Sequence, residues 1–312
     1  MTRSVPFRLA TRSSPLALWQ AQTTAKCLEA AYSDLAPELV EVNSKGDVDQ
    51  TSALSRFGRI GIFTVEVDRA VIEGRADCSV HSLKDLTTEL HEGTMLSGVL
   101  GRGPVEDVLV TRDGATLESL DAGARVATGS LRRRAMLRAA RPDLDCVEMR
   151  GNVNTRLAKL DRGEVDALIM ARAGLERLGF GERISQVLDT GRFLPAVGQG
   201  IVGLVCRGGD WNNHERVQAI RDLEAWDEAL AERALLRALR GGCNVPVGAH
   251  ARAVEGMLVL TARVLSLDGT RAIEAEIGGP REDAESLGRA LGGQLAEQGA
   301  SELIEEARRG TS

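Results

Sequence analysis

A single cysteine stands where a covalent attachment could form. Cys243 lies in the stretch Gly241-Gly242-Cys243-Asn244-Val245-Pro246, directly after a segment of helical composition that spans residues 223–240. Glycine has no Cβ, so the backbone or a ligand can approach such a turn closely. A loop cysteine can also be purely structural, and this stretch alone leaves that alternative open. The other cysteines have apolar or strand-like neighbours and are predicted to be buried: Cys27, Cys78, Cys146 and Cys206.

Arginine is concentrated in one part of the chain. Eight arginines fall within the 32 residues 125–156, and no acidic residue occurs between Asp121 and Asp143. Guanidinium groups bind carboxylates through paired hydrogen bonds, so this segment predicts a site for a ligand with several carboxylates. Four of the arginines lie near expected helix starts, where backbone N–H groups add positive charge: Arg132, Arg133, Arg150 and Arg156. Three others are expected on a solvated helix face: Arg134, Arg138 and Arg141.

An isolated Lys84-Asp85 pair follows the strand-like segment Val80-His81-Ser82. Sites in α/β proteins form where strands end, so this position suits chemistry. Asp85 could simply cap a helix, with Lys84 as its surface partner. In an arginine-lined cleft, Asp85 would instead be an ionised group that stabilises a transient cation and transfers a proton.

Composition narrows the class of protein. The chain has 312 residues, a net charge of −6 and 3% aromatic residues, which argues against a general nucleic-acid binder. Five cysteines without CxxC spacing indicate neither a disulfide framework nor a zinc site. The sequence contains no apolar run of the ~18 residues that a membrane helix needs. Residues 1–6 show no apolar signal core, so we expect a cytoplasmic protein with reduced thiols and no bound metal.

The expected elements alternate between strand and helix. Residues 7–11 form a predicted strand, and Ser14-Pro15 begins a helix with serine as the N-cap. A polar, glycine-punctuated loop is expected at 47–61, and His91 and His214 are expected at the surface. Further strands are predicted at 39–43, 76–81 and 201–206, and helices at 63–73 and 284–306. Strands are also expected within 249–265.

Two pairs of similar segments predict two α/β lobes of similar build. Residues 8–13 (RLATRS) resemble residues 125–130 (RVATGS), and residues 73–77 (EGRAD) resemble residues 162–166 (RGEVD). Turns that any βα protein reuses are the alternative. We expect helix N-termini of the two lobes to face a shared cleft. The predicted division is lobe one at 1–100 with 201–220, lobe two at 101–200, and a C-terminal α+β domain at 221–312.

Six segments, in this order along the chain, resemble the porphobilinogen deaminase family, also called hydroxymethylbilane synthases. Together they span essentially the whole sequence: residues 10–20, 80–85, 130–133, 149–153, 194–200 and 241–248. Without the other segments, residues 194–200 would indicate only a hinge or crossover.

The resemblance implies a fold, a cofactor and a reaction. The fold is α/β, with two solute-binding-protein-like lobes of mixed sheets flanked by helices and a small α+β C-terminal domain. A dipyrromethane cofactor is implied to be joined to Cys243 by a thioether. Members of this family are transferases that add four porphobilinogen units head to tail with release of ammonia. Hydrolysis then frees hydroxymethylbilane for tetrapyrrole and haem biosynthesis, and the resemblance suggests a monomer.

The family pattern also implies roles for individual residues. Asp85 is the expected catalytic residue, which stabilises the methylene-pyrrolenine cation left by deamination and assists proton transfer. Each porphobilinogen carries an acetate and a propionate, which fits an arginine-rich site in an acidic chain. Besides Cys243, the residues implied to bind the cofactor are Ser82, Lys84, Thr128, Ser130, Arg132, Arg133 and Arg156. Those implied to bind substrate are Arg12, Ser14, Arg150 and Arg177.

Three places depart from the family pattern. Ile60 stands where the family's loop commonly has lysine, and whether Arg56 or Arg59 replaces it is open, as is closure of the 47–61 loop. Residues 103–107 lack the arginine of the usual turn, and Gly129 stands where serine is common. These changes concern single contacts and leave the implied reaction intact.

Two rival functions make different predictions. A non-catalytic two-lobed binding protein for a polycarboxylate would bind reversibly and form no covalent adduct. A nucleic-acid binder that used the arginine patch would show binding that falls steeply with salt. A degenerate deaminase-like protein with another role is a third alternative, and the presence of both Cys243 and Asp85 argues against it.

Overall fold

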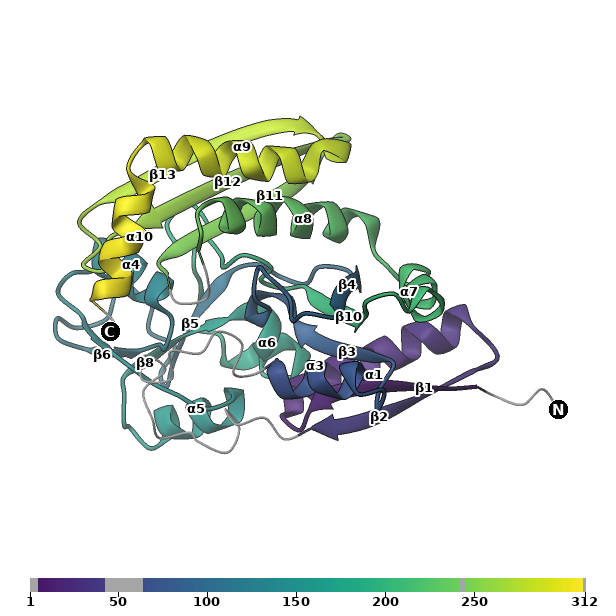
Figure 1. Cartoon of the computed structure of the whole chain (residues 1–312). Helices are drawn as coiled ribbons and strands as arrows, with labels where there is room; N and C mark the ends of the chain where they lie inside the picture. The colour runs from purple at the N-terminus through teal and green to yellow at the C-terminus, as the bar shows by residue number, and fades with distance from the viewer. Residues whose placement is uncertain (1–4, 43–63, 242–244, 311–312) are drawn as a thin grey trace. The chain divides into compact units, whose positions relative to one another are not determined.

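The computed structural model describes residues 5–42, 64–241 and 245–310, which form two compact units (Figure 1). The first unit contains the described residues up to 103 together with residues 201–226. The second contains residues 104–200 and the described residues from 227 onward. Three sheets occur in the described chain, so the predicted α/β class is confirmed.

The first unit is built on a five-stranded sheet in the order β2-β1-β3-β10-β4. β1 runs parallel to β2 and β3, whereas β10 runs antiparallel to β3 and β4. Successive residues of a strand point to opposite faces. Leu9 therefore packs into the core beneath α1, while Ala10 packs against α3. The elements are β1 (Val5–Arg12), α1 (Pro15–Ala31), β2 (Leu35–Val42), α3 (Val65–Ile72), β3 (Cys78–Ser82), β4 (Thr94–Val99), β10 (Val202–Arg207) and α7 (Trp211–Gln218).

The second unit repeats this plan in a sheet ordered β7-β6-β8-β5-β9. β6 is parallel to β7 and β8, and β5 is antiparallel to β8 and β9. α4 packs on the face that carries Val126, and α5 packs on the face that carries Ala127. The elements are β5 (Asp107–Thr111), β6 (Arg125–Ala127), α4 (Leu131–Ala140), β7 (Asp145–Val147), α5 (Val153–Asp161), β8 (Ala167–Ala171), α6 (Arg172–Arg177) and β9 (Gln186–Val187).

The similar segments found in the sequence make the same contacts in each unit. The backbone N–H of Arg8 donates to a carboxylate oxygen of Asp77 at 2.7 Å, and that of Arg125 donates to Asp166 at 2.7 Å. The preceding helix ends at a left-handed glycine in both cases, with φ of 72° at Gly74 and 74° at Gly163. This shared geometry confirms that the two α/β sheets have a similar build.

The C-terminal part of the second unit is a three-stranded antiparallel sheet packed against helices. α8 carries the chain out of the first unit, and Figure 1 shows α9 lying along the sheet. Leu235 of α8, Leu260 of β12 and Leu291 of α9 are fully buried together. The elements are α8 (Leu223–Ala238), β11 (Val247–Val254), β12 (Met257–Leu265), β13 (Ala272–Pro280), α9 (Ala284–Glu297) and α10 (Ala300–Arg309).

A buried carboxylate in α8 fixes the connection at residues 194–200. Glu232 is fully buried and accepts hydrogen bonds from the backbone N–H of Gly198 at 2.6 Å and of Ala251 at 2.8 Å. Gly248 lies against the same connection, because a Cβ there would come within 2.8 Å of the Leu194 carbonyl oxygen. The segment predicted as a hinge or crossover is thus held between α8 and β11.

Several local predictions were wrong in detail. β2 begins at Leu35 rather than 39, β13 was not foreseen, and residues 284–306 form two helices separated at Gly299, whose φ is 97°. Of the four cysteines in the described part of the chain, Cys78 and Cys206 are fully buried, whereas Cys27 and Cys146 are partly exposed. His91 and His214 are partly exposed, which agrees with the surface positions predicted for them.

The predicted solvated arginine face was also wrong. Arg134, Arg138 and Arg141 are each partly buried. Arg138 donates to the Leu267 carbonyl oxygen at 2.8 Å, and Arg141 donates to Asp143 at 2.7 Å. The C-terminal sheet contacts α4. Arg138 and Arg141 donate to backbone carbonyl groups of neighbouring loops and are only partly exposed to water.

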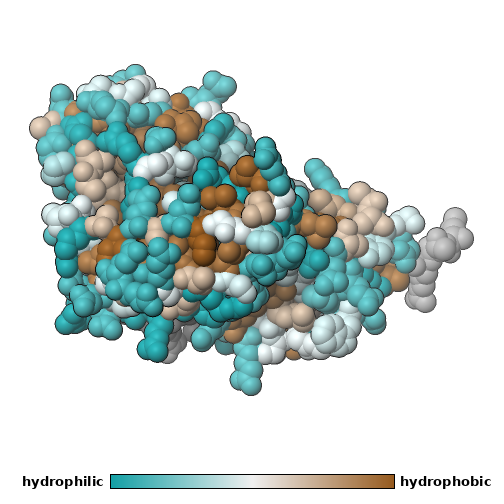
Figure 2. Space-filling model, turned by 90° about the horizontal axis from the view of Figure 1, so that it is seen from above, coloured by the Kyte–Doolittle hydropathy of each residue, from teal (hydrophilic) through white to brown (hydrophobic). Residues whose placement is uncertain are grey.

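Exposed apolar residues are distributed over many elements. On the face shown in Figure 2, hydrophobic residues lie among hydrophilic ones. Among the described residues, the large exposed hydrophobic side chains come from seven separate strands and helices: Val5, Ile72, Val187, Trp211, Leu223, Val254 and Met257. Within the described ranges, the helices are too short or too polar to span a membrane.

Candidate active site

The predicted residues of the first unit gather where β1 and β3 end. Arg12 is the last residue of β1, Ser14 caps α1, and Ser82 is the last residue of β3. β1 and β3 are parallel neighbours, so their carboxyl ends meet at one edge of the sheet. Lys84 and Asp85 follow in the short 3₁₀ turn Leu83–Asp85.

Buried leucines on each side hold the Lys84-Asp85 turn. Leu83 and Leu86 are buried, while Lys84 and Asp85 are partly exposed between them. Gly203 of β10 makes room, because a Cβ there would meet both leucine side chains at 3.1 and 3.2 Å. The buried leucines therefore hold the turn in place while Lys84 and Asp85 remain accessible to solvent.

A buried Asp68–His81 pair supports the end of β3. Asp68 of α3 accepts hydrogen bonds from Ser79 Oγ at 2.7 Å and from His81 Nε2 at 2.8 Å. All three side chains are almost fully buried, and His91 Nε2 lies 3.9 Å from the same carboxylate. His81 is four residues from Asp85, so this pair fixes the strand from which the turn leaves.

Replacing Asp68 by asparagine tests this support. An amide cannot accept both hydrogen bonds with the strength of a carboxylate, so we expect Asp68→Asn to lower the free energy of unfolding by about 1–3 kcal/mol. Urea unfolding of the variant would measure the loss. Glu66→Gln is the matched control on the same helix, because the exposed Glu66–Arg69 pair is worth less than about 1 kcal/mol. Equal stability of both variants would contradict a supporting role.

The predicted residues of the second unit gather in the same way after β6 and β7. Thr128 follows β6 and its backbone N–H donates to the Val147 carbonyl oxygen of β7 at 3.0 Å. Ser130 caps α4, and its Oγ accepts from the backbone N–H of Arg133 at 3.5 Å. Gly129 lies beside the residues after β7, because a Cβ there would approach the Met149 carbonyl oxygen to 3.2 Å.

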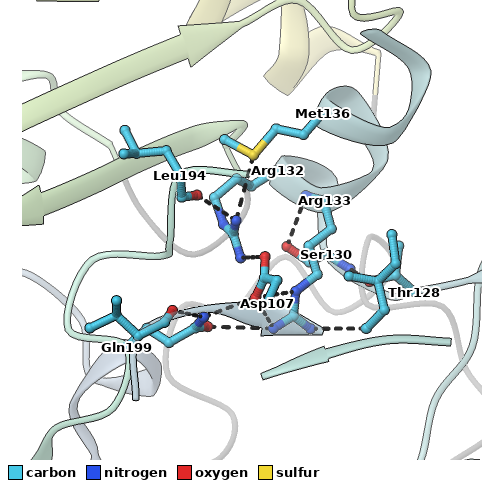
Figure 3. A network of polar contacts seen from close by, with 10 residues as sticks. Asp107, Thr128, Ser130, Arg132, Arg133, Met136, Leu194 and Gln199 are labelled. Carbon is cyan, nitrogen blue, oxygen red and sulfur yellow. Dashed lines mark hydrogen bonds and ion pairs between the residues drawn. The ribbon is translucent and has the colours of Figure 1, made fainter. Parts of the chain in front are cut away.

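Arg132 and Arg133 are held by one buried carboxylate (Figure 3). Asp107, at the start of β5, is fully buried and lies 2.8 Å from Arg132 Nη2 and 2.8 Å from Arg133 Nη2. The two arginine side chains are only 3% and 8% exposed. Arg132 also donates to the Leu194 carbonyl oxygen at 2.6 Å. Gln199 Nε2 donates to Asp107 at 2.8 Å from the other side.

The positive charges of Arg132 and Arg133 decide the pKa of Asp107. Burial alone would raise the pKa of Asp107, but Arg132 and Arg133 more than offset it and hold that pKa far below its usual value. Burial lowers the pKa of Arg132 despite its attraction to Asp107. Two guanidinium groups against one carboxylate leave an excess of one positive charge beside the N-terminus of α4, which favours an anion there.

The sequence did not indicate the role of Asp107 or of Gln199. A signal was available, because a carboxylate that opens the apolar strand Asp107–Thr111 needs a buried partner. Gln199 lay in a segment that the sequence marked only as a connection.

Two guanidinium nitrogens of Arg150 have no hydrogen-bond acceptor among the described residues. Its side chain is 17% exposed, and Glu148 lies 3.6 Å from Nε. Within the described part of the chain, Nε and Nη2 are shielded from solvent and have no hydrogen-bond acceptor. A buried guanidinium without acceptors is costly, which fits a ligand carboxylate at this position.

Arg156 and Arg177 each make a hydrogen bond to the backbone nearby. Arg156 Nε donates to the Gly151 carbonyl oxygen at 2.8 Å, and Arg177 Nη2 donates to that of Gly200 at 2.6 Å. Burial lowers the pKa of Arg177. Arg177 thus contacts the same connection, residues 194–200, that supplies Gln199.

Some predicted residues lie outside the described ranges. These are Cys243, the 47–61 loop, and both Arg56 and Arg59 within that loop. Across the described ranges, no group of three or more His, Cys, Asp or Glu side chains is arranged to hold a metal ion.

Comparison with known families covers most of the chain. A family model described as porphobilinogen deaminase, dipyromethane cofactor binding domain, matches residues 7–215, and one described as porphobilinogen deaminase, C-terminal domain, matches residues 226–297. The chain belongs to the porphobilinogen deaminase family. The predicted family is therefore confirmed, and the domain over residues 7–215 is of the dipyrromethane-binding type.

Individual relatives agree with this family over nearly their whole length. Porphobilinogen deaminase of Xanthomonas axonopodis pv. citri (strain 306) is 46% identical over 300 residues, covering 96% of this chain and 99% of that one. Porphobilinogen deaminase of Xanthomonas oryzae pv. oryzae (strain PXO99A) is 45% identical over 298 residues, covering 96% and 98%.

Solved structures with similar folds are more distant. The VFT2 domain of Bordetella pertussis BvgS has a TM-score of 0.43 at 17% identity, covering 69% of this chain and 86% of that one. A TRAP periplasmic solute binding protein from Pseudomonas putida F1 has a TM-score of 0.42 at 15% identity, covering 75% and 81%. Likenesses at these TM-scores support no conclusion about ligand or activity.

Proposed function

We propose that this chain is a transferase that joins four porphobilinogen molecules head to tail, releases one ammonia at each step and frees hydroxymethylbilane by hydrolysis. Membership of the porphobilinogen deaminase family supports this reaction. The observation in the structure that carries it is the Arg150 guanidinium, whose shielded Nε and Nη2 have no hydrogen-bond acceptor among the described residues. Arg150 lies in the same unit as the positively charged Asp107 network. Porphobilinogen and its oligomers carry two carboxylates per ring, which matches these donors.

A dipyrromethane cofactor fits the residues of the second unit. Its carboxylates would be held by the hydroxyl groups of Thr128 and Ser130 and by the N-terminal backbone of α4, with Arg156 nearby. Arg132 and Arg133 would act mainly through the positive charge that they retain, since both forks contact Asp107. The cofactor, when bound, supplies the pyrrole ring to which the first substrate is joined.

The covalent anchor of this cofactor is proposed to be Cys243. The sequence supports this choice, because Gly241-Gly242-Cys243 follows soon after α8 ends at Ala238. The thiol would lose its proton and form a carbon–sulfur bond to the methylene carbon of a porphobilinogen unit, while the carbon–nitrogen bond at that carbon breaks and ammonia leaves. Of the other cysteines, Cys78 and Cys206 are buried in the first sheet, which makes them unsuitable anchors for an anionic group.

Asp85 is proposed to act on the reacting substrate in the first unit. Loss of ammonia from porphobilinogen leaves a methylene-pyrrolenine cation, and a carboxylate that accepts its pyrrole N–H stabilises that charge. When the new carbon–carbon bond has formed, the ring must lose a proton, which Asp85 can accept and pass on. Lys84 and Ser82 would hold the cofactor, and Arg12 and Ser14 the incoming carboxylates, from the same strand ends. We further propose that the protein is a cytoplasmic monomer that binds no nucleic acid.

Incubation with porphobilinogen tests the reaction. We expect ammonia release and a linear tetrapyrrole that, once cyclised and oxidised, gives a porphyrin absorption band. Rapid-quench intact mass spectrometry should also show the protein carrying one to several added pyrrole units. Reversible binding of porphobilinogen without ammonia release would contradict the proposal and support the non-catalytic alternative.

A further inference from the structure

Two cysteines lie directly opposite each other in the first sheet. Cys78 opens β3, Cys206 is the penultimate residue of β10, and the two are register partners in this antiparallel pair. Both are fully buried. Opposite residues of an antiparallel pair have Cα atoms about 4.5–5.5 Å apart, within the 4.4–6.8 Å that a disulfide spans. Their side chains share one face of the sheet, so the sulfurs can meet without backbone movement.

The two thiols already interact. A hydrogen bond from Cys78 lowers the pKa of Cys206, although burial acts against this, and the same contact with Cys206, together with burial, raises the pKa of Cys78 well above its usual value. The lowered pKa makes Cys206 the more readily ionised of the two thiols. This asymmetry suits stepwise oxidation, because a thiolate is the reacting nucleophile.

The pair also joins two distant stretches of the chain. The first unit consists of the residues up to 103 and the returning segment 201–226. Cys78 lies in the first stretch and Cys206 in the second, with residues 104–200 of the other unit between them. A bond between them would tie the returning segment to the rest of its unit.

We propose that Cys78 and Cys206 form a redox-active dithiol that hydroperoxide oxidants convert into a disulfide. The Cys206 thiolate attacks the peroxide oxygen, the O–O bond breaks with loss of hydroxide, and Cys206 becomes a sulfenic acid. Cys78 then attacks that sulfur, an S–S bond forms and water leaves. One peroxide is reduced for each dithiol oxidised, and an added dithiol reverses the change. Both cysteines lie close to strand ends, so local fraying admits a small oxidant.

Oxidation should stabilise the first unit measurably. Closing a loop of this length removes entropy from the unfolded chain, so we expect the midpoint of its thermal transition to rise by about 5–10 °C. Dithiothreitol should return the midpoint to its original value.

The test uses the holoenzyme with hydrogen peroxide. After quenching with N-ethylmaleimide under denaturing conditions, the expected product has lost two hydrogen atoms, and proteolysis yields a peptide pair linked through Cys78 and Cys206. Cys27→Ser, which changes a partly exposed cysteine of the same unit, should form the link normally. Cys78→Val should abolish it and the thermal shift, and because valine fills a buried apolar site this variant should fold.

Two results would overturn the proposal. One is labelling of both Cys78 and Cys206 by maleimide, which would show that they stayed reduced, after a peroxide treatment that oxidised Cys27 or Cys146. The other is a linked product that persists in Cys78→Val. Neither depends on turnover of porphobilinogen, so the dithiol and the proposed reaction can fail separately.

Discussion

Asp85→Asn is expected to lose at least about 100-fold of the porphobilinogen turnover while the cofactor remains attached. The amide keeps the shape of the side chain but has no negative charge for the substrate cation and cannot accept the proton. Asp85 is partly exposed in a turn anchored by the buried Leu83 and Leu86, so the change should leave stability within about 0.5 kcal/mol. Steady-state rates and intact mass of the same sample would measure both effects.

A matched control shows whether loss of activity comes from the Asp85 carboxylate itself or from removal of any negative charge nearby. Glu92 is an exposed carboxylate seven positions further along the same connection, and Glu92→Gln removes an equal charge. We expect that variant to retain full activity. Comparable rates for the Asp85 and Glu92 variants would exclude Asp85 as the catalytic residue. Loss of the cofactor from Asp85→Asn would instead assign this side chain to cofactor retention.

Asp107→Asn is expected to lower the free energy of unfolding by about 3–5 kcal/mol. Removing this carboxylate leaves two buried guanidinium groups, Arg132 and Arg133, without their shared counter-charge. Urea unfolding would measure the loss. Glu118→Gln removes one partner of the exposed Glu118–Arg192 pair in the same unit and should cost less than about 1 kcal/mol. A cost for Asp107→Asn as small as that of the control would contradict a structural role for the network.

The same carboxyl group predicts how stability depends on pH. Its folded pKa is depressed, so its contribution is complete above the unfolded value of about 3.9 and is lost as pH falls toward the folded value. The difference in stability between the unsubstituted protein and Asp107→Asn should therefore shrink as the pH is lowered from about 6 to about 3. A constant difference over this range would show that Asp107 does not titrate in this way.

The sequence indicated the elements that carry the proposed ligand-binding residues better than it indicated the residues that support those elements. Asp85, Ser130 and Arg150 stand in recognisable segments at strand ends, and local rules of capping and strand termination place them correctly. Asp107 is 25 residues from Arg132 in the sequence and reaches it only through the order of strands in the sheet. Asp68 and His81 likewise meet across α3 and β3.

The wrong predictions have the same physical origin. Arg138 was assigned to a solvated helix face because, unlike Arg132 and Arg133, it is not near a helix start, yet the Leu267 carbonyl of a distant loop accepts its hydrogen bond. Single-segment patterns describe which face of a helix is polar, but they do not reveal what another domain packs against that face. Long arginine side chains then satisfy backbone groups there, since a buried carbonyl needs a donor.

Intact mass spectrometry of the purified protein beside Cys243→Ser tests the central proposal most directly. We predict that the unsubstituted protein is heavier than its polypeptide by one dipyrromethane, and that the variant has the polypeptide mass alone. Treatment of the purified variant with porphobilinogen should not restore the added mass. An unsubstituted protein of bare polypeptide mass that gains no adduct from porphobilinogen, or an adduct that persists in Cys243→Ser, would contradict attachment at this cysteine.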